Sequence, residues 1–443
     1  MTKTIFAPAT APGKAGVAIV RISGNDALHA LSVLCPKKTF KPRYASLATL
    51  LHPESKEIID EALVLYFSAP HSFTGEDVVE LHLHGSFAVM NTLMETLAQF
   101  QNFQIAEPGE FSRRAFANSK MDLTEAEGLA DLIDAETRIQ QQQALRQMRG
   151  ELHHLYDQWR HAIISLLANM EAYIDFPDEE LPQSLRDTIM GQVTLFKQSI
   201  SEHLDDNQRG EKLRSGFYAT ILGAPNVGKS SLINYLAKRD IAIVSNIAGT
   251  TRDVIEVHLD IGGYPVIVAD TAGLRESGEA IEEEGIRRAR QRAEDADLKI
   301  AIFDATSLPA LDKETLSLID ENTLVVLNKA DQIQDLSITP INGQTPIILS
   351  LVTQQGVKDL LDAMQQFIAS RIHISTNPVI TRTRHRVLLQ EALSHLDRFT
   401  PDNAIELAAE DLRMAARSLG KITGYIDIEE ILDEIFRSFC IGK

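Results

Sequence analysis

The feature that most constrains this chain is the stretch 223–231, which reads Gly-Ala-Pro-Asn-Val-Gly-Lys-Ser-Ser. It matches the pattern G-x-x-x-x-G-K-S/T, in which glycines let backbone N–H groups turn inward around phosphate oxygens. The apolar run 217–222 precedes it, and the helix-like run 231–237 follows. A strand, a glycine-rich turn and a helix start are the context that such a loop requires. We therefore expect Lys229 to reach the β- and γ-phosphates of a nucleotide and Ser230 to bind Mg²⁺.

Further motifs follow with the spacing of a GTP-binding domain. Asp270-Thr271-Ala272-Gly273 offers a carboxylate that can hold Mg²⁺ through water and a glycine N–H for the γ-phosphate. The stretch 249–253 offers a threonine for the Mg²⁺ shell, for which we favour Thr251. The last residue of Asn328-Lys329-Ala330-Asp331 can accept two hydrogen bonds from guanine, whereas adenine lacks the N1 donor. Ser350-Leu351 offers a backbone contact to guanine O6, so the motifs together predict GTP binding.

The hydrolytic step lacks a familiar side chain. Many regulatory GTPases have a water-orienting Gln directly after the Gly of D-x-x-G, but Leu274 stands there in this chain. An apolar residue cannot orient water, so a general base must come from elsewhere. The carboxylate-rich stretch 276–284 offers candidates, although most of its carboxylates are expected to lie on a solvated helix. Positive charge at the transition state can come from Arg252, from Arg275 or from a monovalent cation.

Composition limits the remaining function classes. The chain has 443 residues, 44% of them apolar, and a formal net charge of −19, and this length predicts roughly two to four domains. An acidic surface argues against a broad, non-specific nucleic-acid binder. Two cysteines, Cys35 and Cys440, form neither a disulfide framework nor a zinc motif. No apolar run is long enough to span a bilayer, so we expect a soluble, cytoplasmic protein with no membrane attachment.

The regions around the motifs differ in periodicity, which predicts several domains. Residues 1–118 read as strands at 17–22, 62–67 and 78–84 and helices at 25–34 and 87–100, typical of an α+β domain. Helical spacing follows over 119–214, at 125–139, 143–169 and 189–204. It returns over 373–443, at 383–399, 404–419 and 428–439. Both helical groups are amphipathic, so we expect them to pack together as one discontinuous helical domain, with residues 215–372 inserted between its halves.

Within 215–372 strands and helices alternate, as in a Ras-like α/β G domain. Residues 254–259 and 264–268 flank Ile261-Gly262-Gly263, which indicates a hairpin. Short buried strands are expected at 299–303, 323–327 and 346–349, and a final helix at 357–372. These elements predict a parallel sheet with one antiparallel edge, wrapped by helices.

Two charged residues interrupt apolar runs of the first domain. Arg21 lies in the run 17–22 and Glu80 in the run 78–84. Their spacing favours edge-strand residues with solvated charged groups. The alternative is a pocket for an anionic, polar ligand.

Segments along almost the whole chain resemble one family, the tRNA-modification GTPases called MnmE or TrmE, within the TrmE-Era-EngA-like GTPases. These segments are Ala9-Thr10-Ala11-Pro12-Gly13, Val20-Arg21-Ile22-Ser23-Gly24, Ser72-Phe73-Thr74-Gly75-Glu76-Asp77, Pro108-Gly109-Glu110-Phe111, residues 174–180, 247–253 and 270–276, and the terminal Phe439-Cys440-Ile441-Gly442-Lys443. The terminal C-x-G-K together with an inserted G domain is the most specific of these signals. Ser350-Leu351 departs from the family's usual Ser-Ala, which hardly affects a backbone contact.

The resemblance implies that the N-terminal domain binds folate and forms a homodimer. By motif match, the residues expected to contact a 5-formyl- or methylene-tetrahydrofolate are Arg21, Glu80, Lys120 and Lys443. This reverses the preference for solvated groups at the first two positions. Cys440 reaches the same region, either with a role near the site or as a small apolar residue that packs the tail.

The resemblance also implies GTP hydrolysis that is activated by K⁺ and by pairing of two G domains. Asn226, Ser245, Ile247 and Thr250 would bind K⁺, which would replace an arginine finger. Glu282 matches the family's catalytic carboxylate, which acts through a water. The predicted nucleotide-binding residues are Asn226, Val227, Gly228, Lys229, Ser230, Ser231, Ser245, Asn246, Ile247, Ala248, Gly249, Thr250, Thr251, Asp270, Thr271, Ala272, Gly273, Asn328, Lys329, Asp331 and Ser350.

Finally, the resemblance implies a partner, the flavoprotein MnmG (GidA), in a heterotetramer that acts on tRNA. Together they would place an aminomethyl or carboxymethylaminomethyl group on C5 of the wobble uridine, position 34, with folate supplying the one-carbon unit. The alternative is a GTP-switched assembly factor for ribosomes or other ribonucleoproteins, which would be expected to carry a basic RNA-binding module. A membrane scaffold would need a basic amphipathic helix. The acidic composition and the ligand-sized first domain favour the tRNA-modifying enzyme.

Overall fold

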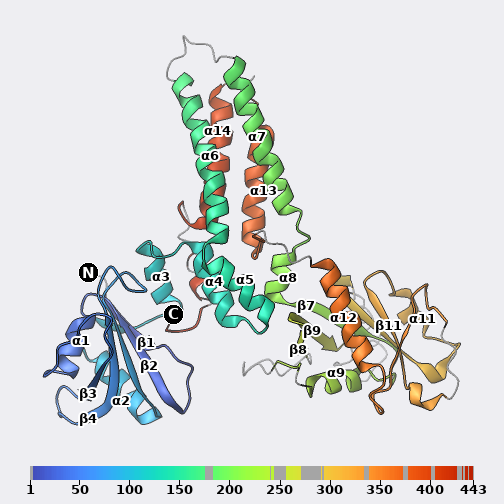
Figure 1. The fold of residues 1–443 in the computed structure, drawn as a ribbon, viewed down its shortest axis with the longest axis horizontal. Coiled ribbons are helices and arrows are strands. Elements are labelled where there is room, and N and C mark those ends of the chain that lie inside the picture. The colour runs from blue at the N-terminus through green and yellow to red at the C-terminus, as the bar shows by residue number, and fades with distance from the viewer. Residues whose placement is uncertain are drawn as a thin grey trace, which may run out of the picture. The chain divides into compact units, whose positions relative to one another are not determined.

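The computed structural model describes residues 3–174, 183–239, 241–243, 256–270, 291, 294–333, 339–372, 378–400, 405–426, 432, 435–437 and 439–442. The chain divides into two compact units. The first comprises 1–130, 147–180 and 402–443, and the second comprises 131–146 and 181–401. Each unit contains one six-stranded sheet and several helices (Figure 1). No helix in the described ranges combines the length and apolar character needed to span a bilayer.

The sheet of the first unit has the order β3-β4-β5-β2-β1-β6. Its strands are β1 (Thr4–Pro8), β2 (Ala15–Ser23), β3 (Ser46–Leu51), β4 (Ile58–Phe67), β5 (Val78–Gly85) and β6 (Phe103–Ile105). All pairings are antiparallel except that of β1 with β6. Helices α1 (Ala27–Leu34) and α2 (Phe87–Ala98) pack with the sheet in one apolar core. The expected strands and helices are present, and β1, β3 and β6 are additional.

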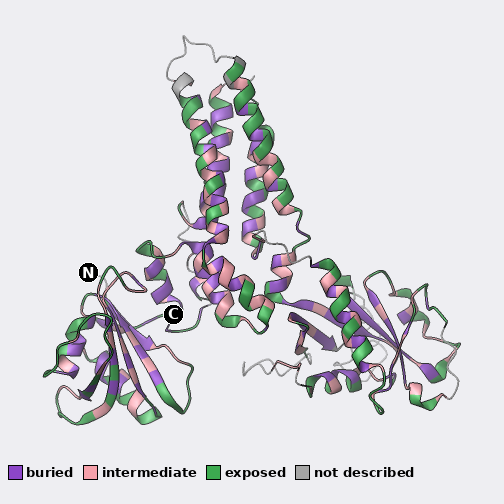
Figure 2. Cartoon of the chain, viewed as in Figure 1, coloured by how far each residue is buried: buried purple, intermediate pink, exposed green. Residues whose placement is uncertain are grey.

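Two helices of the first predicted group pack against two of the second, whereas most of the helix expected at 428–439 lies outside the described residues. In the first unit, α6 (Glu151–Ile174) lies along α14 (Ile405–Thr423), and in the second, α7 (Gln183–Leu204) lies along α13 (Thr383–Arg398). Each pair therefore joins a helix that precedes the nucleotide motifs with one that follows them. Buried residues alternate with exposed ones along these helices (Figure 2), as the amphipathic spacing predicts.

The helix boundaries before residue 170 differ from those expected. The helices expected at 125–139 and 143–169 are three: α4 (Leu123–Asp134), α5 (Arg138–Met148) and α6. Thr137 accepts a hydrogen bond from the backbone N–H of Gln140, whose side chain accepts one from the N–H of Thr137, and this reciprocal cap starts α5. Gly150, at φ 85°, separates α5 from α6. Our single long helices at these positions were therefore wrong.

The second unit contains a mostly parallel sheet of order β12-β11-β10-β7-β9-β8. Its strands are β7 (Phe217–Leu222), β8 (Glu256–Ile261), β9 (Tyr264–Asp270), β10 (Leu298–Asp304), β11 (Thr323–Asn328) and β12 (Ile347–Ile348). Only β8 is antiparallel, and Gly262 and Gly263 form its turn at φ 62° and 95°. Besides α7 and α13, this unit contains α8 (Arg209–Ser215), α9 (Lys229–Ala237), α11 (Lys313–Ser317) and α12 (Val357–Arg371), with the 3₁₀ turns η1 (Ala305–Ser307) and η2 (Ala330–Gln332). This confirms the predicted parallel sheet with one antiparallel edge.

Candidate functional site

The nucleotide motifs of the second unit follow the carboxyl ends of its parallel strands. Gly223 comes directly after β7, Asn328 ends β11, and Ser350 follows β12. Asp270 ends β9, where it is in register with Ile221 of β7. Carboxyl ends of parallel strands share one edge of a sheet, which is the usual ligand crevice of such folds. Segments more than a hundred residues apart are thus brought together.

The phosphate-binding loop has the backbone that its glycines permit. Gly223 and Gly228 have φ 154° and 109°. A Cβ at Gly223 would lie 2.4 Å from the carbonyl oxygen of Ile302, so the loop packs directly on β10. The Nζ of Lys229, the first residue of α9, donates hydrogen bonds to the carbonyl oxygens of Gly223 (2.5 Å) and Ala224 (2.9 Å). The ammonium group therefore lies across the loop where a phosphate would be bound.

The base-recognition motif is tied to this loop by a buried amide. Asn328 Nδ2 donates to the carbonyl oxygen of Val227 at 2.8 Å. Asn328 Oδ1 is buried and has no hydrogen-bond partner among the described residues. Ser350, which is fully buried, donates from Oγ to Asp331 Oδ1 at 2.6 Å and so orients that exposed carboxylate. The tight loop, an unused buried acceptor and an oriented carboxylate fit a bound guanine nucleotide.

A further ion pair supports the base end of the site. Lys329 Nζ lies 2.6 Å from Asp304 Oδ2, at the ends of adjacent strands β11 and β10. Burial raises the pKa of Asp304, but hydrogen bonds from Lys329 and Thr306 outweigh it, so the net pKa is lowered. The Asp304 carboxylate therefore stays ionised and fixes the lysine. We did not predict Asp304, although an Asp at the end of a buried parallel strand was a usable signal.

Many predicted residues lie outside the described part of the chain. They are Ser245, Asn246, Ile247, Ala248, Gly249, Thr250, Thr251, Arg252, Thr271, Ala272, Gly273, Leu274, Arg275, Glu282 and Lys443. Of the predicted K⁺ ligands only Asn226 is described, at φ 65° and exposed. Of the Mg²⁺ ligands only Ser230 is described, and it is exposed. Among the described residues no group of three His, Cys, Asp or Glu side chains is arranged to hold a metal ion.

The first unit pairs the two charged residues that interrupt its apolar runs. Arg21 and Glu80 are register partners on β2 and β5, and Arg21 Nη2 lies 2.9 Å from Glu80 Oε1. Their side chains are 19% and 17% exposed. Both strands lie inside the sheet, so the edge-strand interpretation was wrong. The guanidinium is also within 5.3 Å of the Phe73 ring centroid and 5.7 Å of that of Phe111, two residues we had not singled out as neighbours.

The C-terminal tail reaches the same place. Arg21 Nη1 donates to the carbonyl oxygen of Gly442 at 3.4 Å, and the N–H of Gly109 donates to that of Cys440 at 3.4 Å. Gly442 has φ 95°, and a Cβ there would lie 2.0 Å from the carbonyl oxygen of Pro8. Cys440 itself is exposed. Lys120 is exposed as well and lies beside Gly75, where its Cε is 3.0 Å from a Cβ position built on the glycine.

Comparison with known proteins agrees with this arrangement. The domain described as "GTP-binding protein TrmE N-terminus" matches residues 4–120, and the "MnmE helical domain" matches 123–440. The G domain of the FeoB iron transporter of T. maritima shares 23% identity, with a TM-score of 0.26, over 35% of this chain and 98% of that one, which is too little to carry an argument. The tRNA modification GTPase MnmE of Paramagnetospirillum magneticum is 54% identical over 443 residues, and that of Rickettsia rickettsii is 50% identical over 444 residues, each covering 100% of both chains. This chain therefore belongs to the family of tRNA modification GTPases MnmE.

Proposed function

We propose that this protein binds and hydrolyses GTP as a subunit of a tRNA-modifying complex. The observation that carries the proposal is the linkage of the phosphate loop to the base-recognition motif, in which Asn328 holds Val227 and Ser350 holds Asp331. This linkage presents the phosphate-binding amides and a guanine-reading carboxylate along one sheet edge. We assign the predicted nucleotide-binding residues to GTP, and Ser230 with Thr251 to Mg²⁺. When bound, Mg²⁺ supplies charge neutralisation at the β- and γ-phosphates.

The finer parts of the proposal concern catalysis and the modification itself. Glu282 acts as the catalytic carboxylate through a water, and K⁺ binds at Asn226, Ser245, Ile247 and Thr250. The protein forms a homodimer through its N-terminal domain and works in the cytoplasm with the flavoprotein MnmG. The product is an aminomethyl or carboxymethylaminomethyl group on C5 of uridine 34. The name of the full-length relatives supports the tRNA substrate.

We further propose that Arg21, Glu80, Lys120 and Lys443 bind a tetrahydrofolate, with Cys440 beside them. The half-buried pair of Arg21 and Glu80 supports this assignment. A carboxylate can accept from the amino and amide N–H groups of a pterin ring, and a guanidinium can donate to its carbonyl oxygen. Because the two side chains are in direct contact, both charges would meet the same end of a folate.

The first experiment measures GTP turnover by the purified full-length protein in KCl and in NaCl at equal ionic strength. We expect fast turnover only in KCl. Asn226→Ala should be slow in both salts. Asn342→Ala is the matched control, because Asn342 is also an asparagine at positive φ (48°, against 65° for Asn226) in the same unit. Equal, slow turnover of the unchanged protein in both salts would refute the K⁺ assignment.

A second experiment tests the tRNA part. The protein is incubated with MnmG, tetrahydrofolate, GTP and unmodified tRNA, and the nucleosides are analysed by mass spectrometry. We expect a mass increase confined to uridine 34, absent when GTP or either protein is left out. Turnover of GTP without any change in the tRNA would favour the assembly-factor alternative.

A further inference from the structure

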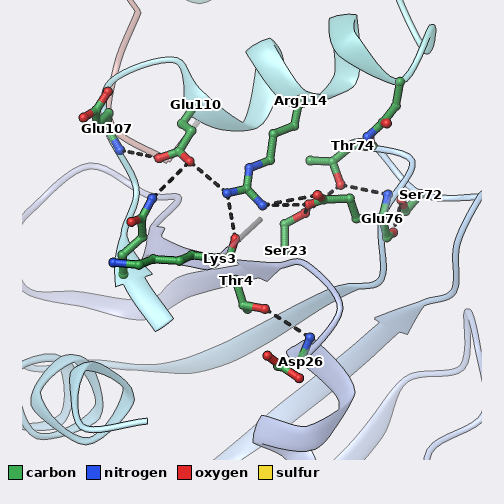
Figure 3. A network of polar contacts seen from close by, with 12 residues as sticks. Lys3, Thr4, Ser23, Asp26, Ser72, Thr74, Glu76, Glu107, Glu110 and Arg114 are labelled. Atoms are coloured by element: carbon green, nitrogen blue, oxygen red, sulfur yellow. Dashed lines mark hydrogen bonds and ion pairs between the residues drawn. The ribbon is translucent and has the colours of Figure 1, made fainter. Parts of the chain in front are cut away.

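Polar contacts hold the loop 72–77 in the first unit (Figure 3). Both carboxylate oxygens of Glu76 accept hydrogen bonds from Arg114 Nη1, Oε1 at 3.2 Å and Oε2 at 3.0 Å. Glu76 Oε2 also accepts from Ser23 Oγ at 2.7 Å, and Ser23 in turn contacts Thr74 Oγ1 at 2.7 Å. Ser23 and Thr74 are fully buried. The loop is therefore fixed at Thr74 and at Glu76.

Arg114 reaches this loop from α3 (Glu110–Ala117). Its other terminal nitrogen, Nη2, donates to Glu110 Oε1 at 2.9 Å and to the carbonyl oxygen of Lys3 at 2.8 Å. The side chains of Arg114 and Glu76 are only 14% and 16% exposed. Charge-assisted hydrogen bonds at such sheltered positions are strong and little weakened by salt. The pair therefore sets the separation of α3 and the loop.

The same two segments enclose Arg21. The loop contributes Phe73, three residues before Glu76, and α3 contributes Phe111, three residues before Arg114. Phe111 and Arg114 lie on one face of the helix because of that spacing. The loop also carries Gly75, beside which Lys120 lies. Arg21 and Lys120, two of the proposed folate-binding residues, therefore contact the loop 72–77 or α3. Arg114 and Glu76 join these two segments.

We propose that Arg114, Glu76 and Ser23 are positioning residues of the folate site, an inference that rests on the proposed folate binding. They touch no ligand themselves. They hold Phe73 and Phe111 at the distance at which the two rings orient the guanidinium of Arg21 toward Glu80. We call the contacts among Arg114, Glu76 and Ser23 the clamp. Loosening the clamp frees Arg21 to turn away from the Glu80 carboxylate, so folate affinity falls although every folate-binding side chain is still present.

The test is a double-substitution cycle on the full-length protein, with 5-formyltetrahydrofolate affinity measured by titration calorimetry. Arg114→Gln and Glu76→Gln should each weaken binding about tenfold, because each breaks the ion pair that joins α3 to the loop. The double variant should also bind about tenfold more weakly, not about a hundredfold, because both changes open the same clamp. Arg114→Lys, which keeps the charge but not the forked geometry, should give an intermediate affinity. A double variant whose loss equals the product of the single losses would overturn the proposal.

The control separates positioning from general stability. Leu93 of α2 is fully buried in the apolar core that α1 and α2 form with the sheet, away from the loop 72–77. Leu93→Ala should lower the unfolding temperature at least as much as Arg114→Gln and leave folate affinity unchanged. An equal loss of affinity in Leu93→Ala would overturn the proposal. If Arg114→Gln fails to fold, Ser23→Ala replaces it, and an affinity unchanged from that of the parent protein would count against the clamp.

Titration of the unchanged protein with folate separates a failure of the folate assignment from a failure of the positioning role. If the unchanged protein does not bind folate, the folate part of the proposed function fails, and this inference fails with it. If it binds and the clamp variants bind equally well, only the positioning role fails.

Discussion

Among the described residues, Ser350 Oγ donates to Asp331 Oδ1 at 2.6 Å, and the Asp331 side chain is exposed. Asp331→Asn would replace an acceptor of guanine N–H groups by an amide that also donates. We expect GTP affinity to fall by at least about a hundredfold, and xanthosine triphosphate, which carries a carbonyl in place of the 2-amino group, to bind more tightly than before. Titration with both nucleotides measures this. Asp359→Asn, an exposed position of α12, should change neither affinity.

Gly228 is the second residue whose replacement is diagnostic. A Cβ there would lie 2.3 Å from Asn328 Nδ2, at φ 109°. Gly228→Ala should break the contact of Asn328 with Val227 and lower GTP affinity by about tenfold or more, in addition to a backbone cost of about 1–2 kcal/mol. Gly343→Ala has a similar backbone cost at φ 82° but no neighbour within 4 Å. The two variants should therefore differ from each other in unfolding temperature and in GTP affinity. Equal GTP affinities would contradict the contact of Asn328 with Val227.

At the scale of elements, the pairing of α7 with α13 should depend on pH through His203. Burial lowers the pKa of His203 from 6.5 to about 4, opposed by Asp206 and assisted by His385 and Arg386. Between these pH values the unfolded chain binds more protons than the folded one. The free energy of unfolding should therefore decrease as pH falls from 6.5 to 4, by up to about 1.4 kcal/mol per unit.

Urea midpoints measured by circular dichroism at pH 7 and pH 5 test this expectation. His203→Gln should flatten the decrease, because glutamine takes up no proton. His161→Gln, at an α6 position whose side chain is 65% exposed, should leave the decrease unchanged. Parallel curves for the parent protein and His203→Gln would show that another group dominates.

Elements were predictable wherever local pattern decides them. The strand 217–222, the glycine hairpin and the helix after the phosphate loop follow from periodicity and turn chemistry alone. The division of α4 from α5 was missed although Thr137-Arg138-Ile139-Gln140 carries the S/T-x-x-Q cap signal. The segment between α4 and α5 contains no Gly or Pro, so the helical periodicity continues through it. Here the cap decides the boundary, and propensity does not.

The candidate sites show the same limit. Motif spacing predicts Lys229, Asn328, Asp331 and Ser350 because each follows a strand of one parallel sheet. The pairing of Arg21 with Glu80 depends on register between strands about sixty residues apart, which spacing does not reveal. The roles of Phe73 and Arg114 depend on how α3 meets a loop, and such non-local packing leaves no periodic signal.

At the scale of the whole molecule, the nucleotide-binding part should be separable. Every buried residue that the structure describes in its two apolar clusters lies between 213 and 372. We expect residues 213–372 alone to unfold cooperatively and to bind GTP within about threefold of the full-length chain, a difference below about 1 kcal/mol. Calorimetry and thermal unfolding measure both. A non-cooperative transition would mean that Ile139, which packs on this core from outside, is essential.

The contact between Arg21 and the carbonyl oxygen of Gly442 joins residues 421 positions apart. A ribosome that adds about 5–20 residues per second needs about 20–80 s to traverse that distance. Isolated domains of this kind fold within seconds. During synthesis the first sheet is thus complete long before the segment that closes over Arg21 has been made. A nascent chain must therefore carry Arg21 without its contact to Gly442 for most of its time on the ribosome, and that contact forms only after residue 442 leaves the exit tunnel.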